Sequence, residues 1–474
     1  MFEIFKKNAE MAVLSKHGGG TAYDLSAIRP MGSPIKKGLN GTSDGIIPFA
    51  KVFDSTIISS KQGAMRRGAV ALYLNAEHKE FESFLEIREP KGDIERQCHN
   101  VHQGAIWTND FMEKVINEDG KERKLWLKAR MKRVKTGEPY DFFIDNANDR
   151  TPDWWKKLGL KIRHSNLCAE MMLPTDDIHT LVCCLSSMNL ANYHEWKDTD
   201  AVYLSILFLD AVLQEFLDKA EGIKGIEDSL RFAKKSRALG LGAVGWHSFL
   251  QSENLPFASV ASTAWTHKIF KHMRAEAEEA TKWLYHYHEN YGTNPEWCEG
   301  QERRNLTLLA VAPNRSSSKL AGGVSQGIEP WGANLYVDDD AKGLHVRKNE
   351  YLEALLEEKG FNTEEIWDQI SEDRGSVQNL DCLTPDEKEV FLTFKEINQL
   401  ELVRQAAIRD IYLDQGQSLN LAFFQNAPAK WINKVHIEAW KLGLRSLYYF
   451  RSESNLRGDS KMRDLYSECV SCAS

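Results

Sequence analysis

Short apolar runs alternate along the chain with segments whose apolar residues recur at helical spacing. Residues 68–74 and 103–107 are two such runs, with the length expected of buried strands. Residues 273–284 give the clearest helical pattern, because four apolar side chains share one face and Gly292 can end the helix. This alternation predicts an α/β architecture.

Helical periodicity also marks the start of the chain and an acidic region near its end. Residues 2–13 place apolar side chains on one face and lead directly into the glycines at 18–20. In residues 384–397 a Thr-Pro pair can begin a helix, and three apolar residues follow at helical spacing. Without internal repeats or a low-complexity linker, we expect one large domain, residues 1–450, and a mobile polar tail, residues 451–474.

Composition narrows the class of partner. The 474 residues carry a net charge of -8 without a long Lys/Arg block, which argues against nucleic acid or an anionic membrane as the main partner. No apolar run reaches the roughly 18 residues of a membrane span, and the first residues mix charges, unlike a signal peptide. We therefore expect a cytoplasmic protein with a small substrate. Eight unevenly spread cysteines favour reduced thiols.

The thiols lie in three places. Cys168 is two residues from Glu170, Cys183 and Cys184 follow fifteen residues later, and Cys469 and Cys472 lie near the end. Each alone has an ordinary explanation, since free cysteine is often a small buried apolar residue and Cys-x-x-Cys can be half of a zinc site. A zinc site is disfavoured because the remaining cysteines are isolated in sequence, so we predict no metal.

Three loop-like segments have open interpretations. Residues 240–245 match the glycine pattern of dinucleotide-binding proteins, but the basic segment 231–237 before them is not strand-like, which favours close backbone packing instead. Residues 313–318 offer hydroxyls, backbone N–H groups and a cation, as in a phosphate cradle or an ordinary helix start. Residues 89–97 are too charged to be buried and form a ligand loop or a simple connection.

Taken together and in this order, these segments resemble the catalytic large subunit of class I ribonucleotide reductase. The resemblance rests on residues 32–35, 45–49, 67–69, 166–170, 313–318, 327–330 and 447–449. It implies a ten-stranded α/β barrel of two antiparallel five-stranded halves, with a central finger loop that carries a radical cysteine.

The resemblance also implies roles for the residues of that loop. Cys168, oxidised to a thiyl radical, would abstract the 3′ hydrogen of a ribonucleoside diphosphate. Glu170 would take the 3′-hydroxyl proton as general base, and Asn166 would hold that hydroxyl. Cys183 would be one of two thiols that reduce the 2′ position, with Cys184 structural, although the two can be exchanged in this interpretation.

Further roles follow from the same resemblance. Tyr448 and Tyr449 would relay the radical from a separate, metal-containing small subunit. Cys469 and Cys472 would re-reduce the active-site disulfide and receive electrons from a thioredoxin or glutaredoxin. The substrate diphosphate would bind Pro313, Asn314, Arg315, Ser316 and Ser317. A deoxynucleotide effector would bind two loops, residues 33–44 and 89–99, near a dimer interface of a higher oligomer, through Lys36, Lys37, Lys91, Gly92, Arg96 and Gln97.

The chain departs from the family pattern at its beginning. An early strand that carries the second reducing thiol is not found, since no cysteine precedes Cys98, which falls in an expected effector loop. Residues 20–22 also replace the usual glycine spacing near the substrate. We expect a split large subunit, in which a separate polypeptide supplies the first part of the barrel. The alternatives are a cobalamin-dependent reductase of the same fold and a non-catalytic nucleotide-binding or regulatory fragment.

Overall fold

A parallel sheet with one antiparallel edge strand forms the first half of the molecule. The computed structural model describes residues 1–36, 41–60, 68–90, 92–340 and 343–452. The sheet has the order β1-β2-β3-β4-β10. Its strands are β1 (Thr21–Asp24), β2 (Val70–Asn75), β3 (Val101–Trp107), β4 (Tyr140–Phe143) and β10 (Ser446–Leu447). The first four are parallel and β10 is antiparallel to β4, so the end of the chain closes this sheet.

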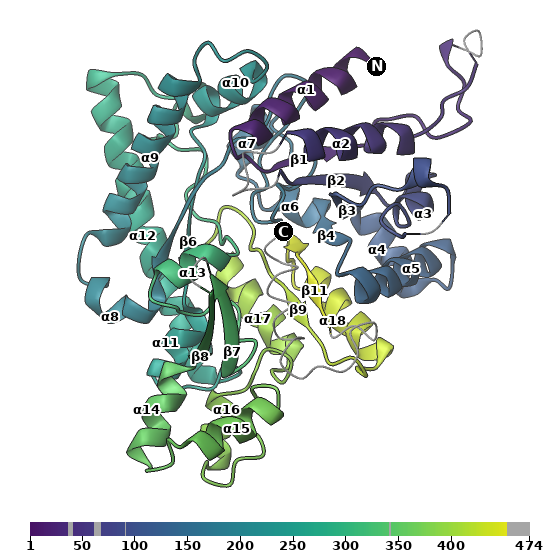
Figure 1. Ribbon diagram of the computed structural model, residues 1–474. Helices are drawn as coiled ribbons and strands as arrows, with labels where there is room; N and C mark the ends of the chain where they lie inside the picture. The colour runs from purple at the N-terminus through teal and green to yellow at the C-terminus, as the bar shows by residue number, and fades with distance from the viewer. Residues whose placement is uncertain (37–40, 61–67, 91, 341–342, 453–474) are drawn as a thin grey trace.

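Helices from the first third of the chain pack around this sheet (Figure 1). They are α1 (Phe2–Lys16), α2 (Ile47–Ser59), α3 (Phe81–Phe84), α4 (Asn109–Asn117), α5 (Lys121–Thr136), α6 (Ile144–Asp149) and α7 (Asp153–Lys157), with a 3-10 turn at Ile94–Arg96. Strands β2, β3 and β4 are almost entirely buried on both faces, as expected for the inner strands of a parallel sheet.

The second half is built on another parallel pair. Strands β5 (Cys184–Asn189) and β6 (Leu239–Val244) are parallel, and parallel bridges from Leu241 to Leu309 and from Val311 to Gln417 continue the arrangement. β9 (Leu421–Ala422) pairs in parallel with β11 (Phe450–Arg451).

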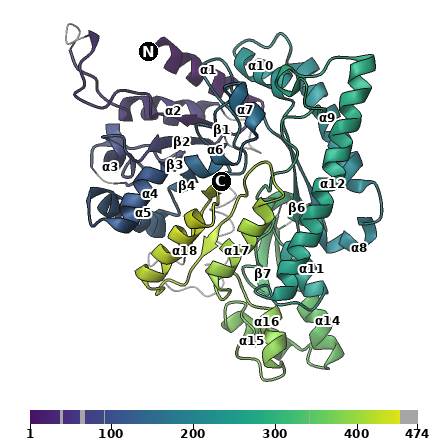
Figure 2. The same ribbon diagram turned by 180° about the vertical axis from the view of Figure 1, so that it is seen from behind.

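Long helices cover the second half, with α9 against α12 and α17 against α18 (Figure 1, Figure 2). The helices are α8 (Tyr193–Trp196), α9 (Ala201–Ala220), α10 (Glu227–Ser236), α11 (Trp246–Ser252), α12 (Val260–Tyr291), α13 (Arg315–Leu320), α17 (Gln399–Asp410) and α18 (Ala429–Lys441). Two 3-10 turns lie at Leu190–Asn192 and Glu296–Cys298.

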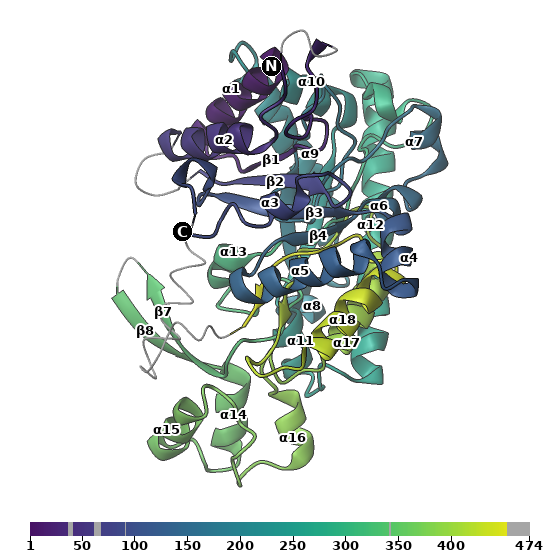
Figure 3. The ribbon, with the colours of Figure 1, turned by 90° about the vertical axis from the view of Figure 1, so that its right-hand side faces the viewer.

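A small lobe projects from this half (Figure 3). It consists of the hairpin β7 (Leu335–Asp340) and β8 (Gly343–Lys348), followed by α14 (Glu350–Glu358), α15 (Glu364–Glu372) and α16 (Pro385–Val390). Leu352, Leu356, Trp367 and Ile370 belong to a separate apolar core beneath these helices.

Most of the predicted elements are confirmed. The run 68–74 contains β2, the run 103–107 lies in β3, residues 2–13 lie in α1, and α12 ends at Tyr291, before Gly292. The glycines of 240–245 lie within and just after β6, where a Cβ on Gly242 would be 2.3 Å from the carbonyl oxygen of Ala310. Close backbone packing therefore explains them.

The helix predicted through residues 391–397 is wrong. α16 starts with the expected capping box at Thr384 but ends at Val390, and α17 starts at Gln399. Between them, Glu396 accepts hydrogen bonds from the backbone and hydroxyl of Thr393, which hold a turn. Phe391, Phe394 and Ile397 are nevertheless buried, so their spacing reports burial rather than a helix.

The division into a domain of residues 1–450 and a tail remains a prediction, because residues 453–474 lie outside the described part. No helix in the described residues is long and apolar enough to cross a membrane.

Candidate active site

The loop that carries Cys168 is held from both halves of the molecule. Three of its carbonyl oxygens accept hydrogen bonds from the second half and from β10: Cys168 from Ser418 (2.6 Å), Glu170 from the backbone of Gly416 (2.7 Å), and Ala169 from Ser446 (2.7 Å). From β2, the hydroxyl of Tyr73 donates to the carbonyl of Asn166 at 3.0 Å. These contacts fix the loop between the two halves.

Asn166 organises the turn of this loop. Its side-chain oxygen accepts hydrogen bonds from the backbone N–H groups of Glu170 (3.1 Å) and Met171 (3.0 Å). Ala169 has a φ of 63°, a left-handed conformation that costs an L-residue roughly 1–2 kcal/mol and that these hydrogen bonds support. The Asn166 oxygen is therefore used within the loop, which leaves its amide N–H groups for Glu170 or a ligand.

Glu170 is a buried carboxyl with a perturbed acidity. Burial raises its pKa to about 7, against the opposing effect of hydrogen bonds from Asn166 and Ser418. The Ser418 hydroxyl lies 3.0 Å from Oε2. A carboxyl with a pKa near neutrality can both accept and return a proton, as general acid–base catalysis requires.

The adjacent thiols Cys183 and Cys184 face opposite ways. Cys183 packs in the same apolar cluster as Cys168 and Tyr449, and burial together with the charge of Glu170 raises its pKa to about 12. The thiol of Cys184 instead contacts the carbonyl of Leu209 in α9, at 3.6 Å. Cys183 therefore lies on the side of the loop and Cys184 on the side of the helix.

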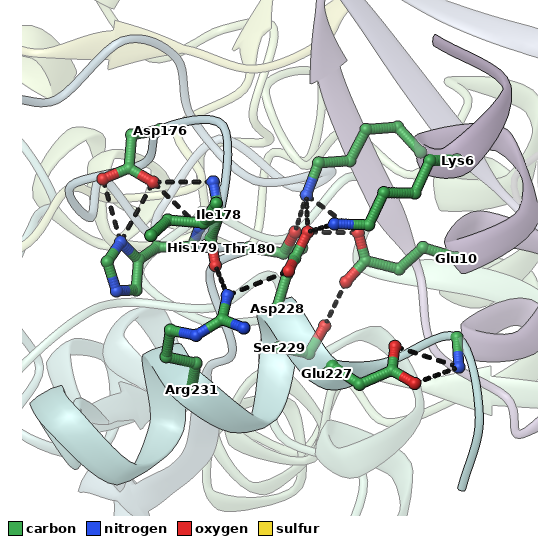
Figure 4. A network of polar contacts seen from close by, with 12 residues as sticks. Lys6, Glu10, Asp176, Ile178, His179, Thr180, Glu227, Asp228, Ser229 and Arg231 are labelled. Carbon is green, nitrogen blue, oxygen red and sulfur yellow. Dashed lines mark hydrogen bonds and ion pairs between the residues drawn. The ribbon is translucent and has the colours of Figure 1, made fainter. Parts of the chain in front are cut away.

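A polar network fixes the segment that leads to Cys183 (Figure 4). From α1, the Lys7 ammonium donates to Thr180 and to Asp228 of α10, both at 2.8 Å, and Thr180 donates to Glu10 at 2.8 Å. Ser229 donates to the other oxygen of Glu10 at 2.9 Å. The network thus joins α1, α10 and the chain three residues before Cys183.

Tyr448 and Tyr449 lie in contact beside Cys168. Their ring centroids are 4.3 Å apart, and both follow β10, whose antiparallel pairing with β4 sets their position. Burial and the neighbouring Cys168, to which it is hydrogen-bonded, raise the pKa of Tyr448 well above its usual value. The buried guanidinium of Arg133 donates to the Tyr448 carbonyl at 2.6 Å. An aromatic path therefore runs from Tyr449 through Tyr448 to the Cys168 thiol.

The structure adds residues that the sequence interpretation missed. Tyr140 of β4 has its ring centroid 4.7 Å from that of Tyr448 and 5.0 Å from that of Tyr449. His102 of β3 lies beside them, with Nδ1 3.3 Å from the Tyr449 oxygen and 2.7 Å from Glu138. These residues are spread over neighbouring strands, so only the strand order reveals the cluster. The polar pair His102 and Gln103 at the start of an apolar run was the available signal.

The predicted diphosphate segment lies at the far ends of β5 and β6. Asn314 adopts a φ of 57° before α13, accepts from Ser187 of β5 at 3.0 Å and donates to the carbonyl of Ala243 at 3.0 Å. Ser316 and Ser317 are exposed, whereas Pro313 and Arg315 are partly buried. Ser187 lies four positions after Cys183, which corresponds to roughly 13 Å along an extended chain.

The predicted effector residues lie apart from this cluster. Lys36 and Gly92 are exposed, and Arg96 and Gln97 are partly exposed. The Lys51 ammonium of α2 donates to the carbonyls of Ile94 and Gln97, so the loop 89–99 packs on α2. Lys37, Lys91, Cys469 and Cys472 lie outside the described residues. Within the described part, no group of three or more His, Cys, Asp or Glu residues is placed to hold a metal ion.

Comparison with known proteins places nearly the whole chain in one family. A family model described as the barrel domain of ribonucleotide reductase matches residues 1–122, 115–291 and 296–450. A ribonucleoside-diphosphate reductase large subunit of Invertebrate iridescent virus 3 is 34% identical over 524 residues, covering 95% of this chain and 81% of the relative. The ribonucleoside-diphosphate reductase subunit alpha of Chlamydia trachomatis serovar D is 28% identical, and the match covers 96% of this chain and 51% of the relative.

A solved structure is similar over nearly the same extent. The class Id ribonucleotide reductase alpha subunit of Actinobacillus ureae superposes with a TM-score of 0.86 at 40% sequence identity. The match covers 96% of this chain and 82% of that chain.

Proposed function

The chain belongs to the ribonucleotide reductase large-subunit family, and from this premise we propose that it reduces ribonucleoside diphosphates to 2′-deoxyribonucleoside diphosphates by thiyl-radical chemistry. One observation carries the proposal: Cys168 is hydrogen-bonded to Tyr448 of the tyrosine pair, and it shares its loop with Glu170, a buried carboxyl of near-neutral pKa. The tyrosine pair can thus deliver the radical to the Cys168 thiol, and Glu170 can accept a proton from the substrate.

The residues divide the reaction into steps. A cysteine thiyl at Cys168 takes the 3′ hydrogen atom, and Glu170 accepts the 3′-hydroxyl proton. The 2′-hydroxyl then leaves as water, and two thiols supply two electrons as they form a disulfide. Cys183 is one of these thiols, and its raised pKa keeps it protonated, as hydrogen donation requires. The Cys168 thiyl is regenerated when the 3′ hydrogen returns.

The phosphate end of the substrate is assigned to the start of α13. The backbone N–H groups that follow Asn314 and the hydroxyls of Ser316 and Ser317 are groups that bind phosphate oxygens. Asn314 is already tied to β5 and β6, so the phosphate end would be fixed relative to Cys183.

The second reducing thiol belongs, in this proposal, to a separate polypeptide. The other described cysteines have different surroundings: Cys98 lies near Asp54 of α2, Cys184 faces α9, Cys298 is near Arg303 and Arg304, and Cys382 packs on the lobe core. A further chain that carries a thiol opposite Cys183 would complete the pair.

Three other partners belong to the proposal. A radical-generating, metal-containing small subunit oxidises Tyr449, and a thioredoxin or glutaredoxin restores the dithiol through Cys469 and Cys472. A deoxynucleotide effector binds near α2 and tunes base choice in a higher oligomer. These roles follow from family membership rather than from contacts in the described residues.

Reconstitution tests the proposal. The chain is mixed with a candidate N-terminal large-subunit fragment, a radical-generating subunit and a dithiol reductant, and deoxynucleoside diphosphate is measured as each component is omitted. Product is expected only from the complete mixture. Full turnover without the fragment would refute the separate thiol chain, whereas nucleotide binding with no turnover in any mixture would identify a regulatory fragment.

A further inference from the structure

Three charged or polar residues form a chain of contacts that ends at the outer tyrosine of the pair. Arg88 pairs with Glu138 at 2.5 Å, and the same Glu138 oxygen lies 2.7 Å from Nδ1 of His102. The other Glu138 oxygen accepts from the backbone of Gln103 at 2.8 Å. Nδ1 of His102 is also 3.3 Å from the hydroxyl oxygen of Tyr449.

The ionisation of Glu138 determines which atom carries the hydrogen. Although burial opposes ionisation, Arg88 and His102 lower the pKa of Glu138 to about 2. A carboxylate only accepts hydrogen bonds, so the Nδ1 atom at 2.7 Å must bear a hydrogen. The Tyr449 oxygen, which faces the same N–H, can therefore accept from His102 but cannot donate to it.

This constraint orients the Tyr449 hydroxyl. The O–H of a phenol lies in the plane of the ring, so its hydrogen has two preferred directions. With an N–H donor on one side, the Tyr449 hydrogen is directed away from His102, and the Tyr449 hydroxyl is hydrogen-bonded to two further phenols, those of Tyr140 and Tyr448. The ring of His102 is itself held, because it stacks on Tyr140 at 20° between planes.

We propose that His102, held by Glu138 and Arg88, is a positioning residue for radical transfer, which donates a hydrogen bond to the Tyr449 oxygen in both the phenol and the radical form of Tyr449. The inference rests on the proposed function. In the first step a phenoxyl radical of the partner subunit takes an electron and a proton from Tyr449, giving a phenol and the Tyr449 radical. Tyr449 then takes an electron and a proton from Tyr448, and Tyr448 takes both from the Cys168 thiol. His102 takes no part in these proton transfers.

Three variants in the reconstituted complex separate this role from a structural one. His102→Leu removes the donor, and His102→Asn restores an N–H at the position of Nδ1. His194→Leu is the control, because His194 also pairs with a glutamate, Glu253, at 2.9 Å but lies in α8 outside the site. Tyr449 is replaced by 3-aminotyrosine in parallel samples, since this easily oxidised analogue holds the radical for electron paramagnetic resonance.

The expected losses follow from one hydrogen bond. His102→Leu should lower kcat about fivefold without changing KM, whereas His102→Asn and His194→Leu stay near the unsubstituted rate. The gx component of the radical at position 449 should rise in His102→Leu only, because fewer hydrogen bonds reach its oxygen. An unchanged kcat and gx in His102→Leu would overturn the inference. An inactive complex with the unsubstituted chain would instead count against the proposed function itself.

Discussion

Removing the Ser418 hydroxyl should change the acidity of Glu170 in a direction that the structure defines. This hydroxyl has one hydrogen and lies 2.6 Å from the Cys168 carbonyl and 3.0 Å from Glu170 Oε2, so the two acceptors share it. A hydrogen bond to a charged group contributes roughly 1.5–3 kcal/mol, and 1.36 kcal/mol corresponds to about one pKa unit. The shared hydrogen places the change near the lower limit, about one unit.

The sign follows from which form the hydroxyl stabilises. It donates to the carboxylate, so Ser418→Ala raises the pKa of Glu170 from about 7 toward about 8. A general base acts only when ionised, so the acidic limb of kcat/KM should move to higher pH. Turnover at pH 7 should fall about fivefold and should nearly recover at pH 9.

The assay is the pH profile of diphosphate reduction by the reconstituted complex, supported by infrared titration of the carboxyl in the chain alone. Ser446→Ala is the matched control, since that serine donates to the carbonyl of Ala169 in the same loop at 2.7 Å. The pH midpoint of the Ser446→Ala profile should equal that of the unsubstituted chain. A loss in Ser418→Ala that is equal at every pH would refute the reasoning.

Two further predictions concern stability. Gly242→Ala should lower the free energy of unfolding by about 1–3 kcal/mol, because its Cβ would be 2.3 Å from the backbone oxygen of Ala310. Gly332→Ala is the control and should leave the melting temperature nearly unchanged, since a Cβ there would have nothing within 4 Å. Equal melting temperatures of the two variants would contradict the packing argument. Asp228→Asn should destabilise the chain at pH 6 in urea unfolding. Although burial opposes ionisation, Lys6 and Lys7 lower the Asp228 pKa to about 2. The difference in unfolding free energy between the unsubstituted chain and Asp228→Asn should therefore narrow as pH falls below about 4. A difference that stays constant with pH would disprove the ionic contribution.

The sequence predicted best where local pattern and burial agree. The runs that form β2 and most of β3 are buried on both faces, and the residues of the Cys168 loop lie in one stretch of chain. The predicted helix through Phe391 failed because apolar spacing reports burial, while the turn there depends on the Thr393–Glu396 hydrogen bonds.

The remaining parts of the site depend on distant pairing. His102, Tyr140 and Tyr449 come from β3, β4 and the segment after β10, and Ser418 is 250 residues from Cys168. No spacing within the chain predicts such neighbours. The different surroundings of Cys183 and Cys184 likewise depend on the packing of α9 against β5, which is distant in sequence.

The most direct test of the central claim is Cys168→Ser in the reconstituted complex, with formation of deoxynucleoside diphosphate as the readout. Serine preserves size and the contacts of the loop backbone, but its O–H bond is too strong to be oxidised by a tyrosine radical. Cys382→Ser, on the core of the lobe, is the control. The account predicts no product from Cys168→Ser and unsubstituted turnover from Cys382→Ser; deoxynucleotide formation by Cys168→Ser would contradict it.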